Sequence, residues 1–152
     1  MKAIIPPPVV LVICGTLMWL MDRFLPSFKF AFPYRTLFFW IILLGGLSVF
    51  ASGVFSIIKR KTTIHPDHKS LLKPTALVTR GIFRYTRNPS YLGMAIMLLA
   101  WMVFLESWLS IAGLIFFVAF ITRYQIMPEE EALAKVFGEE YNRYRNNVRR
   151  WV

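Results

Sequence analysis

Two segments of the chain hold most of the polar side chains that could carry out chemistry. They are KPTALVTRGIFRYTRNPSYLG, residues 73–93, and RYQIMPEEEALAKVFGEEYNRYRNNVRRWV, residues 123–152. In the first segment, Asn88 is followed by Pro89. This pair is a strong helix-start signal, because asparagine is a favoured N-cap and proline is favoured at the first helical position. The free N–H groups of such a helix start, together with the positive end of the helix dipole, bind anions.

Arg84 and Arg87 stand beside this predicted helix start. A capped helix and arginines that contact lipid phosphates would account for the arginines, the asparagine and the proline without any ligand. Ser90 and Tyr91 are less well explained in this way. The segment therefore leaves room for a binding site.

The second segment predicts two short helices. Pro128 suits a first helical position, and Glu129, Glu130 and Glu131 would fill the first turn, where the helix dipole favours each acid by a few tenths to about 1 kcal/mol. This helix should stop at Gly138, and a second one should follow. Three- and four-residue spacings then form one apolar stripe: Leu133, Val136, Phe137, Tyr141, Tyr144 and Val148. Such a stripe predicts an amphipathic segment lying on the cytoplasmic leaflet.

Three consecutive acids at a membrane surface would meet the negative potential of the leaflet. They would be better tolerated opposite a cationic partner. A ligand with both a sulfonium or ammonium group and a carboxylate would fit the two segments together, its carboxylate at the helix start or arginines and its cation at a glutamate. S-adenosylmethionine is such a ligand, so the residues alone indicate a zwitterionic ligand.

The elements that must position these segments are predicted membrane helices. The chain has 152 residues, 57% of them hydrophobic, and long stretches without charge are the signature of a membrane protein. We expect an all-α integral membrane bundle, residues 1–152 forming a single domain, and the alternative of a soluble bundle is disfavoured by the length of the apolar runs. The predicted spans are residues 6–25, 35–58, 88–105 and 107–126, the last two forming a hairpin at Glu106, followed by C-terminal cytoplasmic helices in residues 128–152.

The formal net charge of +10 is concentrated in the loop at residues 59–87 and in the C-terminal segment. Cationic loops stay in the cytoplasm, so both termini and this loop should face it. Anionic lipid headgroups explain much of the charge, and nucleic acid is a poor interpretation because the basic segments flank membrane spans. We expect a multi-pass protein of a bacterial cytoplasmic membrane, with the lipid bilayer as its partner.

A metal site is not expected. Cys14 is the only cysteine and lies within the first predicted span. The HPDH stretch, residues 65–68, lies in a basic loop without a supporting cysteine or acidic cluster, and such a histidine pair is more often solvated.

The ordered motifs of the C-terminal half resemble the integral-membrane methyltransferases typified by isoprenylcysteine carboxyl methyltransferase, and also the phospholipid methyltransferases. The family pattern is a Leu-Val-Thr-x-Gly run, then Arg-His-Pro-x-Tyr, a helical hairpin, Glu-Glu-x-x-Leu and Phe-Gly-x-x-Tyr. Here the corresponding residues are 77–81, 87–91, 129–133 and 137–141, and the resemblance covers residues 73–151. It implies S-adenosylmethionine as cofactor, bound at the cytoplasmic side, and a lipophilic acceptor that enters from the bilayer. The cofactor-binding residues that it implies are Leu77, Val78, Phe83, Asn88, Pro89, Ser90, Tyr91 and Glu129.

Two departures from the family pattern bear on the function. Asn88 replaces the histidine of Arg-His-Pro, and similar bacterial sequences share this asparagine. Gln125 replaces an arginine that, in the eukaryotic carboxyl methyltransferases, handles the carboxylate of the substrate. Gln125 is thus a candidate substrate-binding residue, and a prenylcysteine acceptor is put in doubt; an amine, a thiol or another lipid nucleophile is as compatible.

The residues contain no convincing nucleophilic triad. Glu130 or Tyr91 would act as a base if the acceptor carries a proton, but a direct displacement needs mostly alignment and desolvation. Two alternatives stay open: a nicotinamide-dependent membrane reductase with a similar C-terminal half, and a non-catalytic membrane adaptor.

Overall fold

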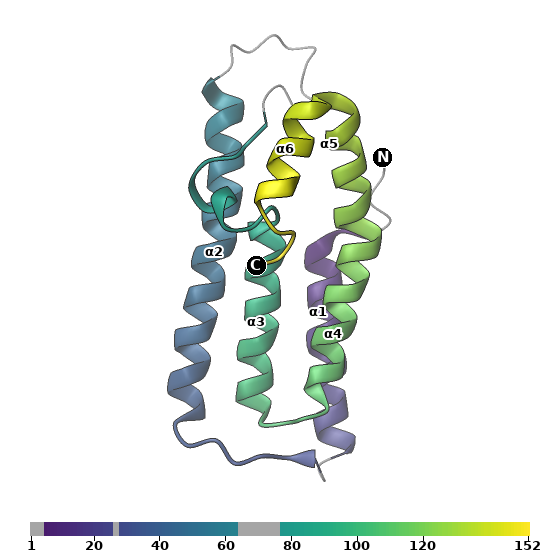
Figure 1. Cartoon of the computed structure of the whole chain (residues 1–152). Coiled ribbons are helices and arrows are strands. Elements are labelled where there is room, and N and C mark those ends of the chain that lie inside the picture. The colour runs from purple at the N-terminus through teal and green to yellow at the C-terminus, as the bar shows by residue number, and fades with distance from the viewer. Residues whose placement is uncertain (1–4, 26–27, 64–76) are drawn as a thin grey trace.

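The computed structural model describes residues 5–25, 28–63 and 77–152. Four helices lie side by side as a bundle (Figure 1). They are α1 (Pro7–Phe24), α2 (Arg35–Thr63), α3 (Pro89–Leu105) and α4 (Ser110–Ile121). The all-α prediction is confirmed, and the only strand-like pairing among the described residues is an isolated bridge between Lys29 and Ser107. The HPDH stretch lies outside the described residues.

The polar segments of the sequence form shorter helices at one end of the bundle. They are the 3₁₀ turn η2 (Gly81–Arg84), the π-helical turn η3 (Thr122–Ile126), α5 (Met127–Phe137) and α6 (Glu139–Asn147). α5 continues upward from α4 through η3, and α6 turns back toward the start of α3 (Figure 1). The turn occurs at Gly138, whose φ of 51° lies in the region that favours glycine.

Three continuous helical segments are long and apolar enough to cross a membrane: Pro7–Phe24, Arg35–Lys59 and Ser110–Phe137. Pro89–Leu105 is a shorter apolar helix that lies among them. Its 17 residues extend about 26 Å at 1.5 Å per residue, slightly less than the apolar thickness of a bilayer. The number of crossings and the side of each terminus therefore stay predictions.

Glycines bring α2 very close to α3. A Cβ atom on Gly93 would lie 2.6 Å from the carbonyl oxygen of Gly46, and one on Gly53 would lie 2.7 Å from the Oγ of Ser90. Small residues allow such close contact between apolar helices, where dispersion forces and hydrogen bonds replace the hydrophobic effect. As a result α2 covers one side of the first turn of α3.

The opposite end of the bundle is closed by the turn between α3 and α4. Glu106 adopts a left-handed conformation with φ 52° and accepts hydrogen bonds from the Arg35 side chain at 2.9 Å and from the Phe32 backbone at 3.1 Å. The predicted hairpin is therefore present, but α4 begins at Ser110 rather than at residue 107 because the turn occupies the residues between.

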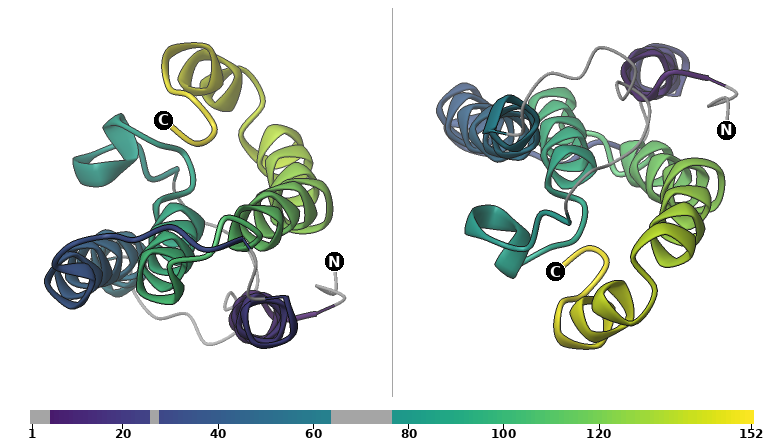
Figure 2. Two further views of the ribbon diagram at one scale, coloured as in Figure 1. Left: turned by 90° about the horizontal axis from the view of Figure 1, so that it is seen from below. Right: turned by 90° about the horizontal axis from the view of Figure 1, so that it is seen from above.

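The C-terminus lies beside the start of α3, close to α6 and η2 (Figure 1). Viewed along the bundle, α5 and α6 lie on one side of α3, and α1 lies on the other (Figure 2). The core that joins these helices consists of buried apolar side chains: Val10, Cys14, Met18, Met94, Leu98, Leu105, Phe117, Ile121 and Ile126.

Candidate functional site

Tyr91 and Glu129 form a hydrogen bond between α3 and α5. The phenol of Tyr91 donates to Oε1 of Glu129 at 2.7 Å, although the two residues are 38 positions apart. Tyr91 is half-buried and Glu129 is exposed. Among the described residues no cationic side chain pairs with Glu129, so its negative charge faces a neutral phenol.

Glu130, the next residue of α5, has very different partners. Its carboxylate accepts two hydrogen bonds from Arg150, at 3.1 Å from Nε and 2.7 Å from Nη2, and it also pairs with Arg87 at 2.9 Å. The Glu130 and Arg87 side chains are each 9% exposed. Two-bond arginine–carboxylate pairs are among the strongest polar contacts in proteins, and here the hydrogen bonds to Glu130 raise the pKa of Arg150.

The C-terminal segment is hydrogen-bonded to the residues that precede α3. The Arg87 backbone N–H donates to the Arg149 carbonyl at 3.0 Å, and the Asn88 side-chain amide donates to the Arg150 carbonyl at 3.0 Å. The hydroxyl of Thr86 donates to the same Arg150 carbonyl at 3.3 Å. These contacts define what we name the tail, residues 148–152.

Asn88 and Pro89 begin α3 as predicted, but the predicted side-chain cap by Asn88 is not formed. Its side chain makes no hydrogen bond to the first turn, because its amide is directed to the tail. The start of α3, where an anion site was predicted, is also covered on one side, where Ser90 packs against Gly53 of α2. The structure thus gives Asn88 and Ser90 partners within the protein, and their role in a ligand site stays a prediction.

The apolar stripe of the C-terminal helices packs partly against the protein. Tyr141 is 1% exposed, and burial raises the pKa of its phenol, with the Glu130 carboxylate adding to the effect. Tyr144 donates to the Phe83 carbonyl at 2.8 Å, and burial raises the pKa of Tyr144 to about 12. The expected contact of this stripe with the leaflet is therefore wrong for these two tyrosines, whereas Val136 is 55% exposed.

The other predicted site residues lie around the start of α3. Leu77, Phe83 and Pro89 are buried, and Val78 and Ser90 are half-buried. Tyr144 joins the Phe83 backbone to α6, so the segment before α3 and the C-terminal helices form one layer. Within this predicted set, the structure joins Tyr91 and Glu129 by a direct side-chain hydrogen bond.

Gln125, the candidate substrate-binding residue, is buried in the π-helical turn. Its side chain is directed to the N-terminal segment, where its amide donates to the Ile5 carbonyl at 2.7 Å. Gln125 is 4% exposed. The structure thus assigns this amide a contact that ties the N-terminal segment to η3.

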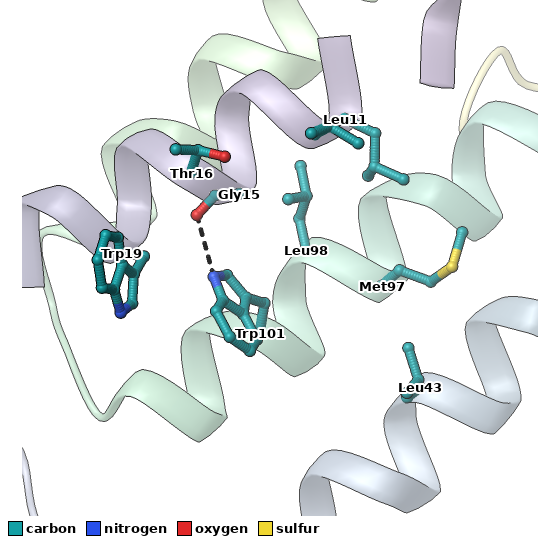
Figure 3. Close-up of a pocket in the computed structure, with 9 residues that line it drawn as sticks. Leu11, Gly15, Thr16, Trp19, Leu43, Met97, Leu98 and Trp101 are labelled. Carbon is teal, nitrogen blue, oxygen red and sulfur yellow. Dashed lines mark hydrogen bonds between the residues drawn. The ribbon is translucent and has the colours of Figure 1, made fainter. Parts of the chain in front are cut away.

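An apolar groove lies between α1, α2 and α3 (Figure 3). It has a volume of about 570 Å³, and Trp19, Leu43 and Trp101 are among its lining residues. The Trp101 indole donates to the Gly15 carbonyl at 3.1 Å across the groove (Figure 3). Ten residues of α3 separate Trp101 from Tyr91, which is about 15 Å along the helix.

Comparison with known protein families matches residues 36–140 to the phospholipid methyltransferase family. The chain belongs to this family. The match runs from α2 through α5 and includes both Tyr91 and Glu129, and it supports a membrane methyltransferase as the class of protein.

Two curated proteins are similar to parts of the chain. An uncharacterized protein of Haemophilus influenzae is 44% identical over 62 residues, which are 41% of this chain and 98% of that protein. Protein-S-isoprenylcysteine O-methyltransferase of Schizosaccharomyces pombe is 37% identical over 78 residues, 50% of this chain and 32% of the yeast protein. The match thus spans about a third of the yeast protein. No solved structure gives a significant match.

The family pattern did not point to several residues that hold the site together. Arg150 and Trp151 at the end of the chain, with Thr86 and Thr122, contribute side-chain hydrogen bonds between segments far apart in the sequence. An isolated arginine, tryptophan or threonine carries no periodic signal, and the only hint in the sequence was the clustering of cations near the C-terminus.

Proposed function

We propose that this chain transfers a methyl group from S-adenosylmethionine to a lipophilic acceptor. The observation that carries the proposal is the Tyr91–Glu129 hydrogen bond, which places beside the start of α3 an exposed carboxylate that pairs with no cation of the described residues. Family membership supports methyl transfer as the reaction class.

The residues fit this donor by charge. The carboxylate of Glu129 would hold the cationic part of the donor, and Tyr91 orients that carboxylate through a bond of 2.7 Å. When bound, S-adenosylmethionine supplies an activated methyl group together with its own leaving group. The protein then contributes alignment and exclusion of water, which are large terms for a direct displacement.

The apolar groove between α1, α2 and α3 is a suitable place for the hydrocarbon chain of the acceptor. Its lining is almost entirely apolar and lies among helices long enough to cross a bilayer. An acceptor chain of about 15 Å would reach from Tyr91 to the level of Trp101 along α3.

The structure favours an acceptor that does not need a guanidinium at position 125. Gln125 replaces the arginine of the eukaryotic carboxyl methyltransferases, and its amide donates to the Ile5 carbonyl. A neutral amide also stabilises a carboxylate much less than the two-bond fork of arginine. We therefore expect prenylcysteine to be a poor acceptor.

The first experiment measures equilibrium binding to the full chain in lipid nanodiscs, with labelled S-adenosylmethionine and, in parallel, labelled NADPH. We expect saturable binding of S-adenosylmethionine that S-adenosylhomocysteine displaces, and no saturable binding of NADPH. Saturable binding of NADPH alone would support the reductase, and binding of neither would support the adaptor.

The second experiment screens acceptors in the same nanodiscs with a methyl-labelled donor. The set includes prenylcysteine analogues, phosphatidylethanolamine, fatty acids and hydrophobic thiols. We expect methylation of an apolar acceptor other than the prenylcysteine analogue. Efficient methylation of that analogue would show that Gln125 does not mark a changed substrate.

A further inference from the structure

The π-helical turn η3 makes contacts with the first and the last described parts of the chain. Within it, Gln125 donates to the Ile5 carbonyl near the N-terminus at 2.7 Å. At its first residue, the Thr122 hydroxyl accepts a hydrogen bond from the Trp151 indole at 3.1 Å. Since Trp151 is the penultimate residue, one turn of helix holds the first and last described parts of the chain.

The Thr122 hydroxyl both donates and accepts a hydrogen bond. It donates to the Val118 carbonyl of α4 at 2.6 Å and accepts from Trp151. A hydroxyl has one hydrogen to donate and lone pairs to accept, so both contacts are made at once. The backbone carbonyl of Thr122 accepts from the Met127 N–H, five residues on, which closes the wide turn.

This turn sets the rotation of α5. A π-helical turn adds one residue to a regular helix, and each residue of an α-helix corresponds to about 100° of rotation and 1.5 Å of rise. Glu129 and Glu130 are adjacent, so a rotation of that size would bring Glu130 to the position around the helix axis that Glu129 now has, and it would turn Glu129 away. In the rotation that α5 has after η3, Glu129 faces Tyr91.

The tail holds α5 and η3 together. Arg150 binds Glu130 of α5, and the next residue, Trp151, binds Thr122 of η3. The tail itself is fixed to the residues before α3 through Asn88 and Thr86. It therefore links the two elements that carry Tyr91 and Glu129.

We propose that Trp151 is a positioning residue, whose hydrogen bond to Thr122 fixes the π-helical turn and thereby holds Glu129 opposite Tyr91. This inference rests on the proposed function only in so far as that pair binds the donor. The hydrogen bond of its indole is made to Thr122, so Trp151 acts through Thr122 and α5.

A double-mutant cycle tests the proposal. Trp151→Phe keeps an aromatic ring and removes the N–H, Thr122→Val keeps the shape and removes the hydroxyl, and Thr122→Ser retains the hydroxyl as the matched control. We expect each of the first two variants to weaken binding of S-adenosylhomocysteine about fivefold, the double variant to be no weaker than the poorer single variant, and Thr122→Ser to bind within twofold of the parent. Additive effects, or lower thermal stability with unchanged affinity, would overturn the proposal.

A second readout needs no ligand. Spin labels on cysteines introduced at Ile57 of α2 and Val136 of α5, in a Cys14→Ala background, report the position of α5 by pulsed electron paramagnetic resonance. The parent should give one narrow distance distribution, and Trp151→Phe should shift or broaden it. An unchanged distribution would overturn the positioning role. If the parent binds no donor or product, the proposed function fails, and this distance measurement alone decides on the positioning.

Discussion

Glu129 and Glu130 are neighbours on α5, yet their surroundings differ in almost every respect. Glu130 is 7% exposed; its oxygens accept hydrogen bonds from Arg150, and it forms an ion pair with Arg87. Glu129 is exposed and is bound by the neutral phenol of Tyr91. One carboxylate is fully engaged in holding segments of the protein together, and the other keeps a charge that a cationic ligand can neutralise.

The two glutamates also differ in how well their surroundings suit a catalytic base. Both oxygens of Glu130 are occupied by guanidinium N–H groups, so Glu130 is poorly placed to take a proton from an acceptor. The phenol of Tyr91 donates a hydrogen bond to Glu129 at the site that we propose for the donor. If the acceptor requires a base, this pair is the better placed of the two.

Glu130→Gln should have the largest effect, and it should be on stability. The substitution leaves two arginines without their counter-charge, one of them with a side chain only 9% exposed, and removing one partner of a buried pair costs about 3 kcal/mol or more. Unfolding of the purified protein in mixed detergent micelles measures this. Glu131→Gln, at an exposed neighbouring position, is the control and should change the free energy of unfolding by less than about 0.5 kcal/mol. Equal effects of the two variants would show that the arginine pairs contribute little.

Glu129→Gln should lower the affinity for S-adenosylmethionine and leave stability nearly unchanged. It removes the charge that we assign to the donor site while preserving size, so the free energy of unfolding should stay near that of the parent. Hydrogen bonds and ion contacts of a charged group contribute about 1.5–3 kcal/mol, which predicts about a 10- to 100-fold weaker affinity for S-adenosylmethionine. Equilibrium binding in nanodiscs measures the affinity. An unchanged affinity would remove Glu129 from the pocket, and Glu131→Gln again serves as the matched control.

Tyr91→Phe should act in the same direction as Glu129→Gln but less strongly. The ring stays in place and only the 2.7 Å hydrogen bond to Glu129 is lost. A loss of about 1 kcal/mol predicts about a fivefold weaker affinity. Because the two residues are in contact, the Tyr91→Phe and Glu129→Gln effects should not add in the double variant. Additive effects would mean that the two side chains act on the ligand separately.

Much of the fold followed from the sequence because it depends on local signals. The apolar stretches, the Asn88–Pro89 start and the Gly138 stop each act over a few residues, and α3, α5 and α6 begin and end close to the expected positions. The meeting of Tyr91 with Glu129 also followed, since a hairpin of two helices returns the chain to the end from which it started.

The contacts of the tail could not be predicted in this way. Arg150 and Trp151 bind residues 20 and 29 positions earlier in the chain, and no periodicity relates them. The π-helical turn was also missed, because apolar spacing does not reveal one additional residue in a continuous helix. The helix dipole explained all three consecutive glutamates equally well, so it did not distinguish the partner of Glu129 from the partners of Glu130.

Asn88→Ala should have the smallest effect. It tests whether Asn88 binds the ligand, as we propose for Glu129, or holds the tail, as Glu130 does. The resemblance to the carboxyl methyltransferases implies that Asn88 contacts the cofactor, whereas in the structure its amide donates to the Arg150 carbonyl. Losing one hydrogen bond of this kind costs about 1 kcal/mol, and the tail keeps its contacts through Arg87, Thr86 and Trp151. We therefore expect a free energy of unfolding lower by about 1 kcal/mol and an affinity for S-adenosylmethionine within twofold of the parent. The opposite result, unchanged stability with an affinity at least tenfold weaker, would place Asn88 with Glu129 in the donor site rather than with Glu130 in the contacts that hold the tail.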